Sequence, residues 1–328
     1  MKKTGFNCLA FLLFFVFSSG LQAQEPVAET REVEVGVILI DIEEINSVSQ
    51  NFIANFFLEF RWRDSSLAHQ GPDSISRDLN TIWHPRLQFL NQQKLVETFA
   101  PEVEIRPDGQ VIYRQRVWGS FSQPLELEDF PFDRQRLEIT LVEVRYGSVK
   151  VRYKVNPVSG IGHSLLIPDW KVLGWGFEPA VVKLNDSLQQ NALVFHLDVK
   201  RYYSFFILKV IFPLMLIVAM SWLVFWIDPS MAASQISVSV TAMLTMIAYR
   251  FAIGGMVPKL PFMTHMDYFV MASTVLVFLS LIEVIYTAYL SDKDQLAKAR
   301  RVDLHARWIA PLVFTLVVLE TLYFRNWL

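Results

Sequence analysis

Residues 205–227 read FFILKVIFPLMLIVAMSWLVFWI, an almost uncharged run that decides the class of the protein. At about 1.5 Å per residue, a helix of about 23 residues crosses a hydrocarbon core of about 30 Å. Three further apolar segments follow, at about 233–253, 267–290 and 305–327. We therefore predict that the C-terminal part, 202–328, is a transmembrane domain of four helices.

The composition agrees with a membrane protein, because 52% of the 328 residues are hydrophobic and only 19% are charged. Lys2 and Lys3 precede an apolar run and then Ala23, which predicts a signal peptide over 1–23. The single cysteine, Cys8, lies inside that signal, so we expect neither a disulfide nor a cysteine-based metal site. A formal net charge of -2 gives no basic surface for nucleic acid.

Between these two regions, residues 24–201 show the period of β-strands. Val33, Val35, Val37 and Leu39 alternate with outward-facing residues, which indicates a strand with one buried face. Similar runs recur at 53–62, 111–121, 136–144, 149–155, 172–177 and 193–199, separated by turn residues. Many short strands with regular turns predict an all-β sandwich.

The expected topology follows from the signal peptide and the charges. An exported sandwich makes the first span run from outside to inside, so the loop after the third span is cytoplasmic. That loop carries Lys293, Lys298, Arg300 and Arg301, as the positive-inside rule requires. We expect a multi-pass protein of the cell (inner or plasma) membrane, with its N-terminal domain outside the cytoplasm.

The second span is the least apolar of the four, and its polar residues follow a pattern. Turning about 100° per residue, one face runs from hydroxyls at the cytoplasmic end to apolar groups above. We call this face the graded stripe: Ser237, Thr241, Leu244, Ala248, Phe251 and Ala252. Such faces around an axis predict a hydroxyl-lined filter below a hydrophobic gate. The alternative is that these hydroxyls bond back to their own helix or hold neighbouring helices.

Three short sequence motifs follow one another along the predicted sandwich. Trp62-Arg63-Asp64 ends a strand, Trp83-His84-Pro85 precedes Asn91, and Phe130-Pro131-Phe132-Asp133-Arg134-Gln135 lies in mid-sandwich. With Arg201, Pro213 and Pro258-Lys259-Leu260-Pro261 behind them, these patterns resemble the pentameric ligand-gated ion channels. Gln123 and Leu137 stand where animal members have two bridging cysteines, which resembles the prokaryotic branch.

The resemblance implies a homopentamer with an extracellular immunoglobulin-like β-sandwich and a four-helix transmembrane bundle. It implies that Phe132, Asp133, Arg201, Pro258, Lys259 and Pro261 couple the sandwich to the membrane helices. The alternative for Asp133 and Arg201 is that they only hold the fold together. The resemblance also places Phe57, Tyr146, Trp175 and Phe177 at the ligand cleft, although Leu90 and the segment 184–191 lack the aromatic residues of an amine cage.

The gating stimulus stays open between a small-molecule agonist and protons. Histidine titrates near neutral pH, and the candidates are His84, His163, His196 and His265. We expect Glu283 and Glu320 to face other helices, because carboxylates are costly in lipid. Asp228 near the inner mouth and the lack of a basic ring favour monovalent cations.

Rival classes remain to be distinguished. A membrane-anchored sensor or receptor that does not conduct would gain nothing from the graded stripe, and a cross-linking ladder of five bands would favour the channel. We expect no enzyme, metal site or cofactor, because the sequence has no metal-ligand cluster, nucleophile elbow or phosphate loop.

Overall fold

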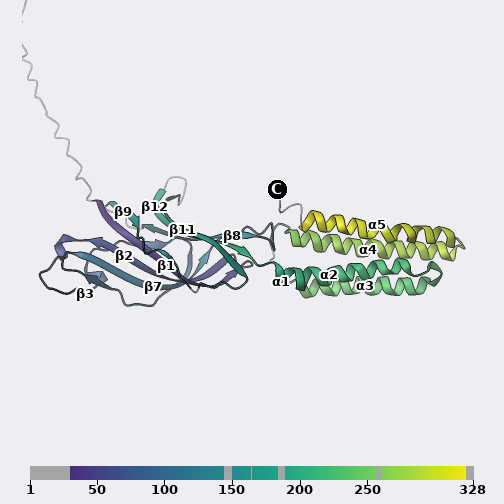
Figure 1. Cartoon of the computed structure of the whole chain (residues 1–328), viewed down its shortest axis with the longest axis horizontal. Helices are drawn as coiled ribbons and strands as arrows, with labels where there is room; N and C mark the ends of the chain where they lie inside the picture. Colours follow the sequence, from purple (N-terminus) through teal and green to yellow (C-terminus); the bar gives the residue numbers. More distant parts are fainter. Residues whose placement is uncertain (1–29, 144–149, 164, 184–188, 256–259, 323–328) are drawn as a thin grey trace, which may run out of the picture.

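The computed structural model describes residues 30–143, 150–163, 165–183, 189–255 and 260–322. The molecule is elongated, with a β-sandwich at one end and a helical bundle at the other (Figure 1). This arrangement confirms the predicted fold class. The proposed signal peptide, Tyr146, Pro258 and Lys259 lie outside the described residues.

The sandwich consists of two sheets. The larger has the order β10-β1-β2-β7-β6-β3, with β5 on β7 and β9 on β1, and the smaller has the order β11-β12-β8-β4. The bounds of the first six strands are β1 (Thr30–Asn46), β2 (Asn51–Arg63), β3 (Ile75–Asp78), β4 (Leu87–Phe89), β5 (Gln92–Glu97) and β6 (Glu102–Ile105). The others are β7 (Gln110–Ser122), β8 (Arg134–Glu143), β9 (Lys150–Val155), β10 (Gly160–Ile161), β11 (Trp170–Lys183) and β12 (Gln189–Arg201). Two 3₁₀ turns, η1 (Ser65–Leu67) and η2 (Leu79–Thr81), complete this region.

Strict alternation builds the core of the sandwich. Every second residue of β2 from Phe52 to Trp62 is buried, because one face of the strand packs against the opposite sheet. Phe56 contacts Phe89 at 5.5 Å and Phe121 at 5.8 Å between ring centroids. Burying each such side chain fully contributes about 1.5–3 kcal/mol, so this cluster fixes the two sheets face to face.

Four helical spans long and apolar enough to cross a membrane occur among the described residues. The first joins α1 (Ser204–Phe206), the π-helical segment η3 (Ile207–Ile211), α2 (Phe212–Leu223) and the 3₁₀ turn η4 (Val224–Trp226). The second joins the turn η5 (Pro229–Met231) to α3 (Ala232–Ile253), and the last two are α4 (His265–Asp292) and α5 (Leu296–Leu322). The helix α5 begins at Leu296, earlier than the predicted 305, because alanines and basic residues continue the helix beyond the apolar segment.

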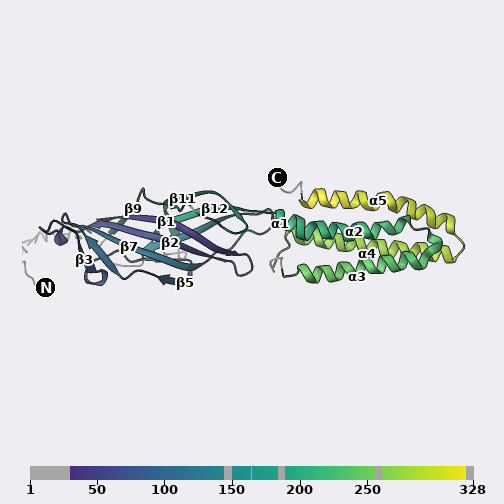
Figure 2. The same ribbon diagram turned by 60° about the horizontal axis from the view of Figure 1, so that its bottom comes forward.

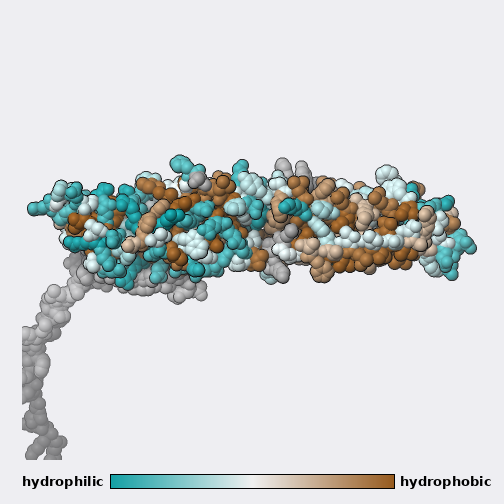
Figure 3. All heavy atoms as spheres, turned by 90° about the horizontal axis from the view of Figure 1, so that it is seen from below, coloured by the Kyte–Doolittle hydropathy of each residue, from teal (hydrophilic) through white to brown (hydrophobic). Residues whose placement is uncertain are grey.

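The helices are arranged so that α3 and α5 lie at opposite edges of the bundle (Figure 2). The helix α3 packs against α2 and α4, whereas α5 packs against α4 and α2. Figure 3, seen from the side of α3, shows a pale band along an otherwise brown bundle, while teal side chains are spread over the sandwich. The outer helix α3 therefore presents weakly polar residues, whereas the exposed residues of α5 include Trp308, Leu312 and Leu316.

Candidate functional site

The face of α3 that is packed and the face that is free are opposite each other. The packed face consists of Gln235, Ser239, Ala242, Met246 and Ile253. All six residues of the graded stripe are exposed in the chain, with Leu244 at 61% and Phe251 at 82%. At about 100° per residue, the two sets point in roughly opposite directions. The structure therefore leaves the graded stripe uncovered along the whole length of the helix.

The hydroxyls of Thr241 in the stripe and of Thr245 beside it are engaged within α3. Thr241 Oγ1 donates to the Ser237 carbonyl at 2.8 Å, and Thr245 Oγ1 donates to the Thr241 carbonyl at 2.8 Å. The alternative considered for these residues, bonding back to their own helix, is thus present. A hydroxyl that has donated its hydrogen still has lone pairs, so Thr241 offers an acceptor to whatever lies beside the helix.

At the end of the bundle where α3 begins, Asp228 is held in place. Its carboxylate accepts from the Ser230 N–H at 3.0 Å and forms an ion pair with Arg300 at 3.0 Å. The hydrogen bonds from Ser230, followed by the charge of Arg300, lower the pKa of Asp228. Because Arg300 shares this charge, Asp228 is a weaker argument for cation passage than the sequence alone suggested.

The junction between the sandwich and the helices contains a buried charge pair. Arg201, the last residue of β12, donates to Asp133 through Nε at 2.7 Å and through Nη2 at 3.0 Å. The side chains are 8% and 1% exposed. Gln135 donates to Asp133 Oδ2 at 2.8 Å, and the Arg201 guanidinium lies 4.1 Å from the Trp170 ring centroid. A fork-shaped pair with further hydrogen bonds of this kind holds the loop 123–133 rigidly against the end of β12.

The same loop is bonded directly to the third span. The His265 N–H donates to the Glu128 carbonyl at 3.1 Å and the Met266 N–H donates to the Phe130 carbonyl at 3.3 Å. The first amides of a helix have no partner within the helix, so the loop satisfies two of them. His265 Nδ1 also lies 3.4 Å from Asp129 Oδ1. These contacts attach the loop to the first turn of α4.

Ring contacts join the loop to the first span as well. Phe130 contacts Phe206 at 4.8 Å and Phe132 contacts Tyr203 at 5.3 Å between centroids. Pro261 is exposed in the chain. The structure thus brings Phe132, Asp133 and Arg201 to one place, and Pro261 lies beside the first turn of α4, four residues before His265.

Among the described residues, the aromatic side chains predicted for the ligand cleft lie on two different sheets of the sandwich. Phe57 lies on β2 of the larger sheet, where it contacts Phe99 at 5.8 Å and the guanidinium of Arg116 at 5.7 Å. Trp175 and Phe177 lie on β11 of the smaller sheet and both contact Phe195, at 5.9 and 6.1 Å. A cleft that contains both groups therefore needs two subunits.

A cavity lies near the second of these groups. It has a volume of about 700 Å³ and is bordered by the end of β8 and by β9, β11 and β12. Its lining residues include Glu143, Arg152, Tyr153, Gln190 and Asn191. The Tyr153 hydroxyl donates to Glu143. Sequence reasoning did not single out these polar residues, because their strands meet only in the folded sandwich.

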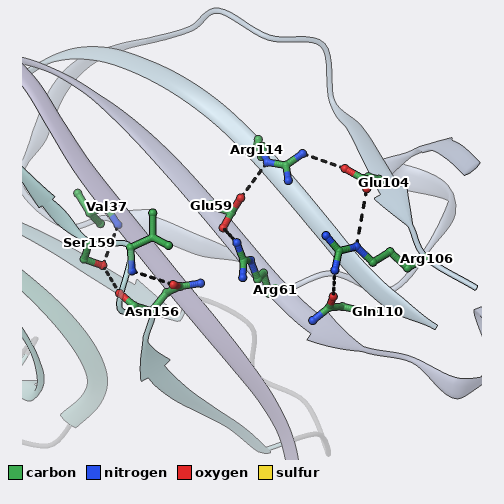
Figure 4. Close-up of polar contacts among 10 residues, drawn as sticks. Val37, Glu59, Arg61, Glu104, Arg106, Gln110, Arg114, Asn156 and Ser159 are labelled. Carbon is green, nitrogen blue, oxygen red and sulfur yellow. Dashed lines mark hydrogen bonds and ion pairs between the residues drawn. The ribbon is translucent and has the colours of Figure 1, made fainter. Parts of the chain in front are cut away.

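A charged network lies on the same face of β2 as Phe57 (Figure 4). Arg114 bridges Glu59 at 2.8 Å and Glu104 at 2.9 Å, and Glu59 also pairs with Arg61 at 2.5 Å. The hydrogen bond from Arg114 lowers the pKa of Glu104, with a further contribution from Ser74. The network was missed from the sequence because its members come from three strands.

A β-sandwich whose loop is hydrogen-bonded to a bundle of four membrane-length helices defines a membrane receptor. Two family models match the chain in succession. The neurotransmitter-gated ion-channel ligand binding domain matches residues 18–168, and the neurotransmitter-gated ion-channel transmembrane region matches residues 210–302.

The chain is also similar to individual channels. It is 28% identical over 312 residues to a proton-gated ion channel of Gloeobacter violaceus, and the aligned region covers 91% of this chain and 85% of that protein. It is 26% identical over 270 residues to the gamma-aminobutyric acid receptor subunit beta-4 of Gallus gallus, which covers 79% of this chain and 55% of that subunit. The chain belongs to the pentameric ligand-gated ion channel superfamily.

Membership confirms several predictions. The protein is a ligand-gated ion channel and not an enzyme, since that is what the family comprises. Its four spans follow an extracellular ligand-binding domain, so it is a multi-pass membrane protein.

Proposed function

We propose that the chain forms a homopentameric, cation-conducting channel in which α3 lines the pore. One observation carries this proposal: the graded stripe is uncovered on the side of α3 that faces away from α2 and α4. In a ring of subunits, the edge of the bundle opposite α5 faces the axis, and α5 faces lipid. The proposal includes removal of 1–23, an extracellular domain over 24–201 and a transmembrane domain over 202–328.

The stripe divides into a filter and a gate. Ser237 and Thr241 form the filter, while Leu244, Ala248, Phe251 and Ala252 form a hydrophobic constriction that closes by dewetting. The stripe carries no basic side chain. Because Thr241 Oγ1 has donated its hydrogen to the helix, its remaining lone pairs favour a cation over an anion.

Gating passes through the loop 123–133. The Asp133–Arg201 pair fixes this loop to the sandwich, and the bonds to His265 and Met266 fix it to α4. Phe132 and Pro261, with Pro258 and Lys259 outside the described residues, complete the proposed coupling interface. Motion of the sandwich is then transmitted to the bundle, and the stimulus shifts a two-state equilibrium by its preference for one state.

His265 favours protons as the stimulus. A protonated imidazole forms an ion pair with Asp129, 3.4 Å away, whereas a neutral one forms at most a hydrogen bond. One similar protein is a proton-gated channel. A small-molecule agonist is the second candidate, and the cavity of about 700 Å³ beside β11 and β12 favours it. That agonist would lie between subunits, near Phe57 of one and Trp175, Phe177 and Tyr146 of the next.

The first test is current under voltage clamp in oocytes, with external pH steps and a sodium chloride gradient. We expect a pH-dependent current whose reversal potential follows the cation gradient. A reversal potential that follows chloride would contradict cation selectivity. A surface-expressed protein with no current at any pH would exclude proton gating and leave the agonist.

Pore lining is tested by single cysteines, because the chain has only Cys8. A charged thiol reagent should block Thr241→Cys in the open state, whereas Thr315→Cys on the exposed surface of α5 should be unaffected. Block of the α5 variant with no effect at Thr241 would reverse the assignment of the two outer helices.

A further inference from the structure

The end of the bundle where α3 begins encloses three polar side chains from three helices. Gln235 of α3 and Asp303 of α5 are both fully buried, and Glu283 of α4 is partly buried. Gln235 Nε2 donates to Asp303 Oδ2 at 3.2 Å and to the Ile227 carbonyl at 2.9 Å. Gln235 therefore ties the pore helix to α5 and to the end of the first span.

The oxygens of this group outnumber its donors. The Glu283 carboxyl lies within hydrogen-bonding reach of the Asp303 carboxyl. Among the described residues, nothing donates to Asp303 Oδ1, to the Gln235 carbonyl oxygen or to either oxygen of Glu283. Ionised carboxylates only accept hydrogen bonds, so two of them in contact need a proton between them.

The surrounding charges compensate this group only in part. The charge of Arg307 on α5 acts on Asp303, and the Arg307 Nε donates to the Phe225 carbonyl at 2.8 Å. Arg300 is paired with Asp228. Arg301 and His305 line the groove beside Glu283, and among the described residues neither of them forms an ion pair with Glu283 or Asp303. Without a proton, the pair would hold two like charges in a low-dielectric region.

The site borders a groove on the surface of the bundle. Glu283 lies in this groove of about 560 Å³ between α4 and α5. The groove is otherwise apolar except for Ser280, Arg301 and His305. Arg301 belongs to the basic segment that the positive-inside rule places in the cytoplasm. We infer that protons reach Glu283 from this side, past Arg301 and His305.

We propose that Glu283 and Asp303 form a proton-binding site, which holds one shared proton and thereby keeps α4, α5 and α3 joined at the cytoplasmic end. Removal of that proton leaves two facing carboxylates, which repel each other and weaken the hold of Asp303 on Gln235. This site responds to cytoplasmic pH, separately from any extracellular stimulus. The proton binding itself does not depend on the proposed pore role of α3, but its effect on the current does.

Infrared spectroscopy of the purified channel tests the proton directly. The wild type should show a protonated carboxyl C=O band that disappears on alkaline titration and is missing from Glu283→Gln and from Asp303→Asn. Glu320→Gln, which removes an exposed acid from α5, should keep the band. A wild-type spectrum with no titrating carboxyl band overturns the proposal, and so does a band that survives in both variants. The wild-type titration decides even if a variant fails to assemble.

The effect on the channel is tested in inside-out patches at fixed external pH. Stepping the cytoplasmic pH should change the wild-type current, while Glu283→Gln should lose this response, because its amide donates to the Asp303 carboxylate at every pH. If the current of Glu283→Gln responded to cytoplasmic pH as the wild-type current does, the proposed proton-binding site would be overturned. Failure of the pore assignment is distinguishable, since it would remove the current response and leave the infrared band in place.

Discussion

The sandwich and the bundle place their polar residues in opposite ways. In the sandwich, β2 buries Phe52, Phe56 and Phe60 and turns Glu59 and Arg61 outward. In the bundle, Leu208, Leu216 and Trp308 are exposed, whereas fully buried positions hold Ser221, Gln235, Ser273, Thr287 and Asp303. Polar side chains are stable in water but costly in lipid, so the sandwich buries its apolar side chains and exposes polar ones. The bundle exposes apolar side chains to lipid. Buried polar residues in the bundle therefore mark contacts between helices.

The graded stripe on α3 is the exception within the bundle. It is exposed in the chain, yet it carries hydroxyls that lipid would not favour. The difference between the two outer helices thus separates a face suited to water from a face suited to lipid. The following predictions test this contrast, beginning with the largest expected effect.

Arg201→Ala should be the most damaging, with a cost of about 3–5 kcal/mol in the free energy of unfolding, because it leaves the Asp133 carboxylate buried without its partner. The measurement is thermal unfolding of the purified protein in one detergent. Arg136→Ala is the matched control, since its pair with Asp198 is exposed to solvent and should contribute little to stability. Equal losses in both variants would refute the special position of the buried pair.

Leu39→Ala should cost about 2–5 kcal/mol, because Leu39 is 1% exposed in the sandwich core. Leu312→Ala, on the 61% exposed surface of α5, should change the midpoint of unfolding little, since a shorter apolar side chain still faces lipid. Thermal unfolding compares the two. A larger loss at Leu312 would show that this surface is packed against protein.

Leu244→Ala should favour the conducting state, because a smaller apolar side chain lowers the barrier to hydration of the constriction. We expect about a tenfold lower stimulus for half-maximal current, which corresponds to about 1.4 kcal/mol. Dose–response curves under voltage clamp measure this shift. Ile247→Ala, on the same helix but outside the graded stripe, serves as the control and should leave the dose–response curve unchanged. If Leu244→Ala changed neither the gating nor the leak current, Leu244 would not belong to the gate.

Glu104→Gln should have the smallest effect, well under about 1 kcal/mol, because its pair with Arg114 is largely exposed. The folded-state pKa of Glu104 is lowered from 4.5 by the hydrogen bond from Arg114. Its contribution is therefore complete above pH 4.5 and is lost as the pH falls through the lower folded-state value. Unfolding curves at neutral and acid pH should differ slightly less in the variant, and a loss of the same size at acid and neutral pH would be inconsistent with this pair.

The long elements could be predicted from the sequence. The alternation in 53–62 predicted β2, and the apolar run 233–253 predicted α3, because burial of one face and span length both leave a local pattern. The short strands β3, β4, β5, β6 and β10 were not predicted, since two to six residues carry too little periodicity. The fourth helix was predicted to begin at about 305, whereas α5 begins at Leu296, because a hydropathy pattern detects the apolar part of a helix and not its charged first turns.

The contacts between residues far apart in the sequence were harder to predict from the sequence. Family motifs predicted that Asp133 and Arg201 lie together, but no local pattern indicates that Glu283 meets Asp303. Glu320 was expected to face other helices, and within one chain it is exposed, so this expectation stays a prediction for the assembled ring. The predicted ligand residues remain a prediction, since Phe57 and Trp175 lie on different sheets of the described chain.

The two amide bonds between the loop 123–133 and α4 have a mechanical consequence. Ring contacts such as Phe132 with Tyr203 transmit compression only, because packed surfaces separate freely when they are drawn apart. The hydrogen bonds from His265 and Met266 to loop carbonyls also carry tension. In the proposed gating motion, the third span would therefore be pulled as well as pushed by the sandwich, and the bundle would return to its starting position when the stimulus is withdrawn.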